Sequence, residues 1–410
     1  MIVRGVISSA RGALVDALLS AAVGDGVRIS TSRGEVVNGV VTASHAGRAT
    51  VAVHGSLDGV CSGDAIAVDP AALTLPLGTV LLGRSIDACG EPLDDRLEPK
   101  GLRVPAYVPV PAASARSPIE APFWTGIRAI DGLLTLGRGS RVGIFGPPGS
   151  GKSTLLEAFV RSSSADAVVV GLIGERGREA QTWMRAVPSH CAIVCATSDR
   201  SAAERVRAAT VAIAQAAALR SRGLHVLFIL DSLARYAAAV REVAVGTSEP
   251  VGRAGYPPSV FAELARYVEA AGTAAVGSIT LIATVLSDGD ERDPVSDASR
   301  SLLDGHVQLS PSLAQAGRFP AIDVPASASR TMAGVAGREH MADAATVRRA
   351  IAVLAHGEEA RSLGILPSDP FAVRALGAEA SLEAFLRQCS SPERPAATLS
   401  ALAALADTLR

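Results

Sequence analysis

Apolar and polar side chains alternate along several short segments between residues 1 and 73, as in the run Thr-Val-Ala-Val-His at 50–54. Alternation with a period of two is typical of strands that bury one face. Glycine and aspartate interrupt these segments at close intervals, which is the pattern expected of tight turns between strands. We therefore predict an all-β domain over residues 1–73, a small barrel or sandwich. Its predicted strands are 2–7, 27–31, 36–44, 49–54 and 65–68.

From residue 141 the pattern changes to uninterrupted apolar runs that are separated by helical stretches. Runs without polar alternation are expected for strands that are covered on both faces of a parallel sheet. Ser201 and Glu204 have the spacing of a capping box, and Gly223 stands where a left-handed residue would end the same helix. The alternation of strands and helices predicts an α/β core over residues 74–335. The predicted core strands are 141–145, 167–173, 191–195, 225–230 and 278–285.

Two other segments frame this core. The stretch from Leu102 to Pro122 is rich in proline, which suits a connector lying on the surface of the core. Beyond about residue 341, apolar side chains recur at helical spacing, for example at Val347 and Ile351. Residues 336–410 are therefore predicted to form a C-terminal helical domain.

Composition narrows the possible functions. The 410 residues include 39 basic and 40 acidic side chains, and only 3% are aromatic. Because binding to nucleic acid needs a basic surface or a platform for stacking bases, we expect no nucleic-acid partner. No run approaches about 18 consecutive apolar residues, and the first residues lack the pattern of a secretory signal, so we expect a cytoplasmic location. The 5 cysteines and 7 histidines are scattered without zinc-type spacing, which gives them no predicted metal role.

The sequence Gly-Pro-Pro-Gly-Ser-Gly-Lys-Ser at 146–153 fits the pattern G-x-x-x-x-G-K-[ST] and lies between a predicted buried strand and a predicted helix. In this context the glycines let backbone N–H groups surround a phosphate at the positive end of the helix. Lys152 would contact the β- and γ-phosphates, and the hydroxyl of Ser153 would bind Mg²⁺. The pattern predicts an ATP site. The residues predicted to bind the nucleotide are Gly146, Gly149, Ser150, Gly151, Lys152, Ser153 and Thr154.

Two carboxylates follow predicted core strands and should therefore meet the P-loop at the same edge of the sheet. Asp231 ends the strand 225–230 and is the candidate second ligand of Mg²⁺, although an aspartate here could also serve only to cap the next helix. Glu175 follows the strand 167–173 beside Arg176, in a position to orient the water that attacks a phosphoanhydride. From the residues alone, a solvated charged turn explains Glu175 and Arg176 about equally well.

Further segments make the chain recognisable. The runs Gly-Ile-Arg-Ala-Ile-Asp at 126–131, Gly-Glu-Arg-Gly-Arg-Glu at 174–179, Gly-Tyr-Pro-Pro-Ser-Val-Phe at 255–261 and Arg-Phe-Pro-Ala-Ile-Asp-Val at 318–324 occur in that order. Together with the P-loop they resemble the type III secretion and flagellar export ATPases, which are relatives of the catalytic subunit of the rotary ATP synthase. The resemblance extends over nearly the whole chain. It implies an α/β P-loop (RecA-like) core with a parallel sheet, preceded by a small N-terminal β-barrel domain and followed by a C-terminal helical domain.

The resemblance also implies residue roles. Glu175 would activate the attacking water, with Arg176 as a partner on the phosphate side. Phe319 falls where the family places an aromatic ring against adenine, an interpretation that competes with ordinary core packing. Arg330 falls where the family supplies an arginine finger to the neighbouring subunit. A shared site implies an oligomeric ring, a homohexamer in the family, and a monomer of low activity.

The expected activity is Mg²⁺-dependent hydrolysis of ATP to ADP and phosphate, which energises type III protein export at the cytoplasmic face of the inner membrane. The expected partners are a central stalk protein, a stator-like regulator and complexes of export chaperones with their substrates. In the family the acidic loop at 288–294 would face the stalk, whereas the residues themselves fit a solvated turn equally well. Relative to the family, Pro147 and Pro148 stiffen the P-loop, and the short N-terminus argues against a regulator-binding extension.

Alternatives to a virulence-type injectisome ATPase stay open. A flagellar export ATPase fits the same motifs. A subunit of a rotary ATP synthase is a second alternative, although the helical domain lacks an obvious Asp-Glu-Leu-type acidic segment. An RNA-translocating hexamer is the third, and the absence of aromatic-rich RNA motifs in the β-domain counts against it.

Overall fold

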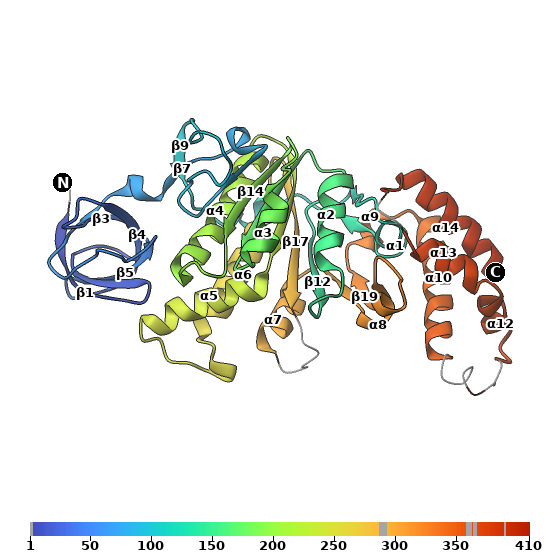
Figure 1. The fold of residues 1–410 in the computed structure, drawn as a ribbon. Helices are drawn as coiled ribbons and strands as arrows, with labels where there is room; N and C mark the ends of the chain where they lie inside the picture. Colours follow the sequence, from blue (N-terminus) through green and yellow to red (C-terminus); the bar gives the residue numbers. More distant parts are fainter. Residues whose placement is uncertain (1–2, 287–292, 358–362, 364–366, 389–390) are drawn as a thin grey trace.

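The computed structural model describes residues 3–286, 293–357, 363, 367–388 and 391–410. Figure 1 shows a barrel at the N-terminal end, a central sheet flanked by helices, and a group of helices at the C-terminal end. The strand pairing confirms the predicted fold class, because a closed barrel precedes a mainly parallel sheet that carries the P-loop.

The N-terminal barrel is built from β1 (Arg4–Arg11), β2 (Leu14–Leu18), β3 (Gly26–Ser30), β4 (Val36–His45), β5 (Arg48–His54) and β6 (Ala65–Val68). Neighbouring strands are antiparallel in the order β1-β2-β5-β4-β3-β6, and the barrel closes because β1 also pairs with β6. Alternate residues fill an apolar interior that includes Val27, Ile29 and Val51, each fully buried. The period-two pattern of the sequence therefore reflects one face turned inward and one turned outward.

One barrel strand, β2, is absent from the sequence prediction. It has only five residues and carries Asp16 at its centre. Asp16 accepts hydrogen bonds from Thr50 at 2.8 Å and from Ser9 at 2.9 Å, both on neighbouring strands. The other difference is in β1, which runs beyond the predicted 2–7 through a bulge between Ile7 and Ser9. The polar residues Ser9 and Asp16, which are hydrogen-bonded across the strands, interrupt the apolar pattern, so neither β2 nor the second half of β1 is evident from the sequence.

The central sheet contains every predicted core strand. These strands are β12 (Arg141–Gly146), β13 (Ala167–Ile173), β14 (Cys191–Ala196), β15 (His225–Asp231) and β17 (Ser278–Leu286). The sheet order is β19-β18-β12-β17-β15-β13-β14-β8, and β16 pairs with β17. The sheet is extended at its two margins by β8 (Arg84–Ile86), β18 (Gly305–Leu309) and β19 (Ile322–Ser329), and the short strand β16 (Gly272–Thr273) is antiparallel to the start of β17. The parallel pairs β12–β17, β17–β15 and β15–β13 place the carboxyl ends of these strands at one edge.

Helices cover the sheet and explain the uninterrupted apolar runs. They are α1 (Arg128–Leu133), α2 (Lys152–Ser162), α3 (Gly177–Met184), α4 (Ala202–Arg220), α5 (Leu233–Gly246), α6 (Pro258–Ala270), α7 (Pro294–Leu302), α8 (Pro311–Gln315) and α9 (Met332–Val335). The predicted capping box is confirmed, because Ser201 and Glu204 exchange side-chain to backbone hydrogen bonds at the start of α4. Gly223 has the predicted left-handed conformation, with φ at +85°.

The proline-rich connector lies along the surface of the core, as predicted. It includes β9 (Arg103–Pro105), which pairs with β7 (Thr74–Pro76), and ends at β10 (Pro122–Phe123), which pairs with β11 (Leu136–Gly137). Arg207 of α4 donates to the carbonyl oxygen of Ala106 at 3.3 Å, and Arg116 forms an ion pair with Glu269 of α6 at 2.7 Å. These contacts attach the connector to two core helices.

The C-terminal helices are α10 (Arg338–His356), α12 (Pro370–Gly377), α13 (Glu379–Leu386) and α14 (Pro395–Leu409). Residues predicted from helical spacing, such as Val347, Phe385 and Leu402, are buried between them. α10 packs against α14 and also against α1, so these helices continue the core cluster beneath the P-loop helix. Among the described residues, no helix combines the length and the apolar character needed to cross a membrane.

Candidate active site

The P-loop joins β12 to α2 at the carboxyl edge of the sheet. Gly149 and Gly151 have φ angles of +80° and +88°, a region that side chains with a Cβ rarely occupy. Gly151 is the residue before the first turn of α2, so the backbone of the loop leads directly into the positive end of the helix dipole. The loop and the helix N-terminus therefore have the backbone geometry that the sequence pattern predicts for an anion site.

Side chains of the P-loop take up different positions. The ammonium group of Lys152 donates to the carbonyl oxygens of Gly146 at 2.7 Å and Pro147 at 2.6 Å. Ser150 is buried and donates to Pro147 at 2.8 Å, which holds the loop closed on itself. Ser153 and Thr154 are exposed in the first turn of α2. Their hydroxyl groups are therefore accessible to a ligand that lies over the loop.

Asp231 lies at the end of β15 with its carboxylate buried. It accepts a hydrogen bond from the hydroxyl of Thr284 on β17 at 2.6 Å. Burial raises the pKa of Asp231, while the bond from Thr284 and the positive charges of Arg235 and Lys152 lower it. The carboxylate thus lies within the electrostatic range of the P-loop lysine. This placement fits the predicted ligand role better than a helix cap, because the cap of α5 is supplied by Ser232 instead.

Hard oxygen donors suit Mg²⁺, and the donors here are the carboxylate of Asp231 and the hydroxyl of Ser153. In the described part of the chain, no group of three or more His, Cys, Asp and Glu residues could hold a metal by itself. A magnesium ion commonly has one or two protein ligands and completes its shell with water and substrate phosphates. The residues present therefore fit a metal that arrives with the nucleotide.

Glu175 follows β13 and is buried, with only 5% of its surface exposed. Its carboxylate forms an ion pair with Arg235, a residue in the first turn of α5. Burial is the largest influence and raises the pKa of Glu175 to about 7. The bond from Arg235 opposes this rise, and the negative charge of Asp231 adds to it. A carboxyl group that titrates near neutral pH is well suited to accept a proton from water.

Arg235 is a residue of the candidate site that the sequence did not predict. Its contact with Glu175 joins the start of α5 to the end of β13, two segments that are separated by α3, β14, α4 and β15. The sequence does contain a signal, since Arg235 follows Asp231 by about one helical turn and must lie at the same sheet edge. An arginine one turn after the aspartate that ends a core strand is therefore a candidate partner for a carboxylate at that edge.

Arg176 is placed differently from Glu175. It precedes α3, and its side chain is 80% exposed. Within the residues that the structure describes, its only ion pair is with Glu179, at 3.8 Å. The charged pair at 175–176 therefore divides into a buried carboxylate and a solvated guanidinium.

Phe319 lies beside the P-loop. A Cβ atom built on Gly151 would be 3.8 Å from the ring of Phe319, and 49% of Phe319 is exposed. An aromatic ring that is half exposed next to a phosphate-binding loop is available for stacking. Its exposure is not what ordinary core packing would give.

Arg330 lies far from the P-loop of its own chain. Ser329, the preceding residue, pairs with Gly305, and Gly305 pairs with Val142 near the start of β12. The P-loop begins at Gly146, four residues further along β12, which corresponds to about 13 Å at about 3.3 Å per residue. Arg330 is exposed at this opposite end of the strand. The acidic loop at 288–294 cannot be placed in the same way, because residues 288–292 lie outside the described residues.

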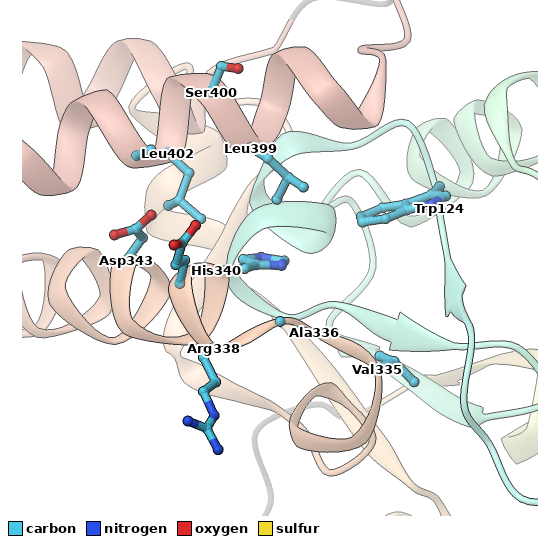
Figure 2. Close-up of a pocket in the computed structure, with 12 residues that line it drawn as sticks. Trp124, Val335, Ala336, Arg338, His340, Asp343, Leu399, Ser400 and Leu402 are labelled. Atoms are coloured by element: carbon cyan, nitrogen blue, oxygen red, sulfur yellow. The ribbon is translucent and has the colours of Figure 1, made fainter.

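A cavity of about 690 Å³ between α9, α10 and α14 is separate from this site (Figure 2). Trp124, His340, Asp343 and Leu402 line it, and its lining includes none of the predicted nucleotide-binding residues. Nε2 of His340 lies 2.8 Å from the carbonyl oxygen of Gly132, so this histidine attaches α10 to the core. The cavity lies at a junction between helices, and the candidate catalytic residues do not line it.

Comparison with known proteins assigns this fold and site to a family. Residues 126–329 match the ATP synthase alpha/beta family, nucleotide-binding domain. The chain is 43% identical over 329 residues to the flagellum-specific ATP synthase of Salmonella typhimurium, covering 77% of this chain and 71% of that protein. It is 40% identical over 412 residues to the type 3 secretion system ATPase of Sinorhizobium fredii, covering 94% of this chain and 88% of that protein.

A solved structure has the same architecture. The assembled ATPase EscN of the enteropathogenic E. coli type III secretion system matches with a TM-score of 0.91 at 37% identity, covering 98% of this chain and 100% of that chain. Fold and site thus define a nucleotide-hydrolysing protein of the ATP synthase alpha/beta family. Within that family the chain belongs to the type III secretion and flagellar ATPases. The resemblance that the motifs indicate is confirmed.

Proposed function

We propose that this ATPase forms a homo-oligomeric ring, binds ATP with Mg²⁺ where neighbouring subunits meet, and uses hydrolysis to energise type III protein export. One observation carries the proposal. The P-loop, Asp231 and Glu175 converge at one edge of the sheet, whereas Arg330 lies at the other end of β12. An arginine finger at that end can complete only the site of an adjacent chain.

In the proposed reaction the side chains at the carboxyl edge have distinct roles. Backbone N–H groups of the P-loop and the ammonium group of Lys152 bind the phosphates. Ser153 and Asp231 hold Mg²⁺, which neutralises phosphate charge when it is bound. Glu175 orients the attacking water and accepts its proton, which its pKa of about 7 favours.

Three further side chains complete the proposed site. Arg176, exposed before α3, contacts the nucleotide from the phosphate side. Phe319 stacks against adenine beside the P-loop, and its half-exposed ring supports this role. Arg330 of the adjacent subunit stabilises the charge that develops on the transferred phosphoryl group. A chain without a neighbour lacks this last group and should hydrolyse ATP slowly.

The proposed assembly draws on solved relatives. EscN has been solved in an assembled form, and also in complex with its central stalk EscO, the latter matching this chain with a TM-score of 0.89 at 36% identity. By analogy we propose a hexamer of this chain around a central stalk protein. A stator-like regulator and complexes of export chaperones with substrates are the further proposed partners, at the cytoplasmic face of the inner membrane. The proposed limits of the three domains are 1–73, 74–335 and 336–410.

The role of Glu175 is tested by the substitution Glu175→Gln, which keeps the shape of the side chain and removes its ability to accept a proton. We expect nucleotide binding to persist and kcat to fall by about 10²- to 10⁴-fold. Glu157→Gln is the matched control, because Glu157 lies on α2 in a surface ion pair with Arg161 at 3.5 Å. Phosphate release and equilibrium binding of a fluorescent ATP analogue give the two readouts. Normal turnover by Glu175→Gln would refute its assigned role.

A flagellar export ATPase is the second candidate, because the chain is also 43% identical to a flagellum-specific ATP synthase. Expression in one strain that lacks an injectisome ATPase and another that lacks a flagellar ATPase separates the two. Restored secretion of injectisome substrates supports the first candidate. Restored motility alone supports the second.

A further inference from the structure

A set of contacts outside the predicted site ties the C-terminal helices to the loop that carries Phe319. The backbone N–H of Gln388, two residues beyond the end of α13, donates to the carbonyl oxygen of Phe319 at 2.9 Å. The neighbouring Arg318 forms an ion pair with Glu383 of α13, with Nε 3.2 Å from Oε2. The loop is therefore held from the side of the C-terminal helices.

The side chain of Gln388 forms hydrogen bonds with both its oxygen and its nitrogen. Its oxygen accepts a hydrogen bond from the backbone N–H of Arg128 at 2.8 Å. Its nitrogen donates to the carbonyl oxygens of Gly126 at 2.7 Å and Ser391 at 2.9 Å. Because Gly126 lies in the turn before α1 and Arg128 is the first residue of α1, this single side chain fixes the segment that follows α13 to the core.

The turn at 125–128 is also bonded to the far end of the P-loop helix. Ser162, the last residue of α2, donates to the carbonyl oxygen of Thr125 at 2.7 Å. The buried carboxylate of Asp131 accepts hydrogen bonds from the backbone N–H groups of Thr125 and Gly126, both at 2.8 Å. A Cβ on Gly126 would come within 2.7 Å of the Cβ of Ser162, so the turn packs tightly on α2. The turn is thus a firm anchor for Gln388.

These contacts connect the two ends of the P-loop helix α2 to each other through Phe319, Gln388 and the turn at 125–128. α2 begins beside the ring of Phe319 and ends at the turn, and Gln388 connects the turn back to the carbonyl oxygen of Phe319. We propose that Gln388 is a positioning residue for recognition of the adenine base: it sets the ring of Phe319 relative to the P-loop and links α13 to occupation of the base site. The inference rests on the proposed stacking of adenine on Phe319.

The consequence is selective for the base. A displaced ring weakens contacts with adenine, while the phosphates, held by the P-loop and Lys152, are bound as before. A residue that only stabilised the fold would weaken both. Inorganic tripolyphosphate, which has phosphates and no base, distinguishes these outcomes.

The experiment measures ATP hydrolysis by the full chain and competitive inhibition by tripolyphosphate. For Gln388→Ala we expect KM for ATP to rise about tenfold, equivalent to about 1.4 kcal/mol. We expect kcat and the inhibition constant of tripolyphosphate to stay within about twofold of wild type, since the P-loop contacts are untouched. Ser381→Ala, an exposed position on the preceding helix α13, is the matched control and should leave all three constants unchanged.

Two further variants keep the outcome decisive. Gln388→Glu retains the acceptor for Arg128 but places a carboxylate oxygen against the carbonyl oxygens of Gly126 and Ser391. It should therefore also raise KM for ATP, and it decides the matter if Gln388→Ala does not fold. Equal weakening of ATP and tripolyphosphate, or a loss of kcat at unchanged KM, would overturn the inference. If Phe319→Ala raises KM for ATP while Gln388→Ala does not, the positioning role is wrong and the base site stands. If neither substitution changes KM, both assignments are wrong.

Discussion

Replacing Arg235 with glutamine removes the positive charge that lies against Glu175. In this ion pair the Glu175 side chain is 6% exposed and the Arg235 side chain 29%, so solvent screens their interaction only in part. Burial raises the pKa of Glu175 to about 7, and the bond from Arg235 pulls that pKa downward by favouring the ionised carboxylate. Without Arg235 the pKa of Glu175 must rise further, and the base becomes protonated at neutral pH.

The size of the effect follows from the bond that is lost. A hydrogen bond to a charged group contributes about 1.5–3 kcal/mol, and one pKa unit corresponds to about 1.4 kcal/mol. The pKa of Glu175 should therefore move from about 7 to about 8–9. At pH 7 the ionised fraction falls from about one half to between about one tenth and one hundredth. We expect kcat/KM at pH 7 to fall about 5- to 50-fold and to recover above about pH 9.

The assay is the pH dependence of kcat/KM for ATP hydrolysis by wild type, Arg235→Gln and Arg205→Gln. Arg205 also pairs with a glutamate, since it lies 2.8 Å from the exposed carboxylate of Glu242, and assays of its variant share every ionisation of the substrate. The acid limb should lie near pH 7 in wild type and in the Arg205 control, and at higher pH in Arg235→Gln. A loss of rate of equal size at every pH would show that Arg235 does not set the protonation of Glu175.

Two other substitutions test the shared site and the fold. Arg330→Ala should retain ATP binding and lose about 10³-fold or more in kcat. Mixing Arg330→Ala chains with Glu175→Gln chains should restore part of the activity, because some interfaces then contain both wild-type residues. If rings verified to contain both variants are inactive, the shared site is contradicted. Ser201→Ala removes the hydroxyl that accepts from the backbone N–H of Glu204 at 3.2 Å, and should lower stability by about 1 kcal/mol. Calorimetry of Ser201→Ala should show a Tm lower by about 2–4 °C, and an unchanged Tm would mean that the cap contributes nothing.

The fold was predictable where burial dominates the sequence. The core strands are buried on both faces, so their apolar runs identify them without tertiary information. Margin strands carry no such signal: β18 alternates buried and half-buried residues, and β19 contains Pro325 and exposed positions. Their pairing depends on the strand beside them, which a local pattern does not contain.

The site was predictable to the extent that its residues follow core strands. Asp231 and Glu175 could be assigned to one edge because parallel strands bring their carboxyl ends together. Arg235 and Gln388 act through contacts with residues distant in sequence, and neither belongs to a pattern that names its partner. Phe319 needed the structure for a different reason, since only its exposure separates a stacking ring from a core ring.

The closed barrel at the N-terminus has a consequence for the proposed ring. Because β1 pairs with both β2 and β6, the barrel presents no free strand edge to a neighbouring copy. Open edges invite uncontrolled pairing between identical chains, and crowding several copies side by side would multiply that risk. Barrels that meet in a ring can touch only through side chains, whose shape and charge specify one partner and one orientation. The same closure keeps the barrel strands of separate chains from pairing with one another before the ring assembles.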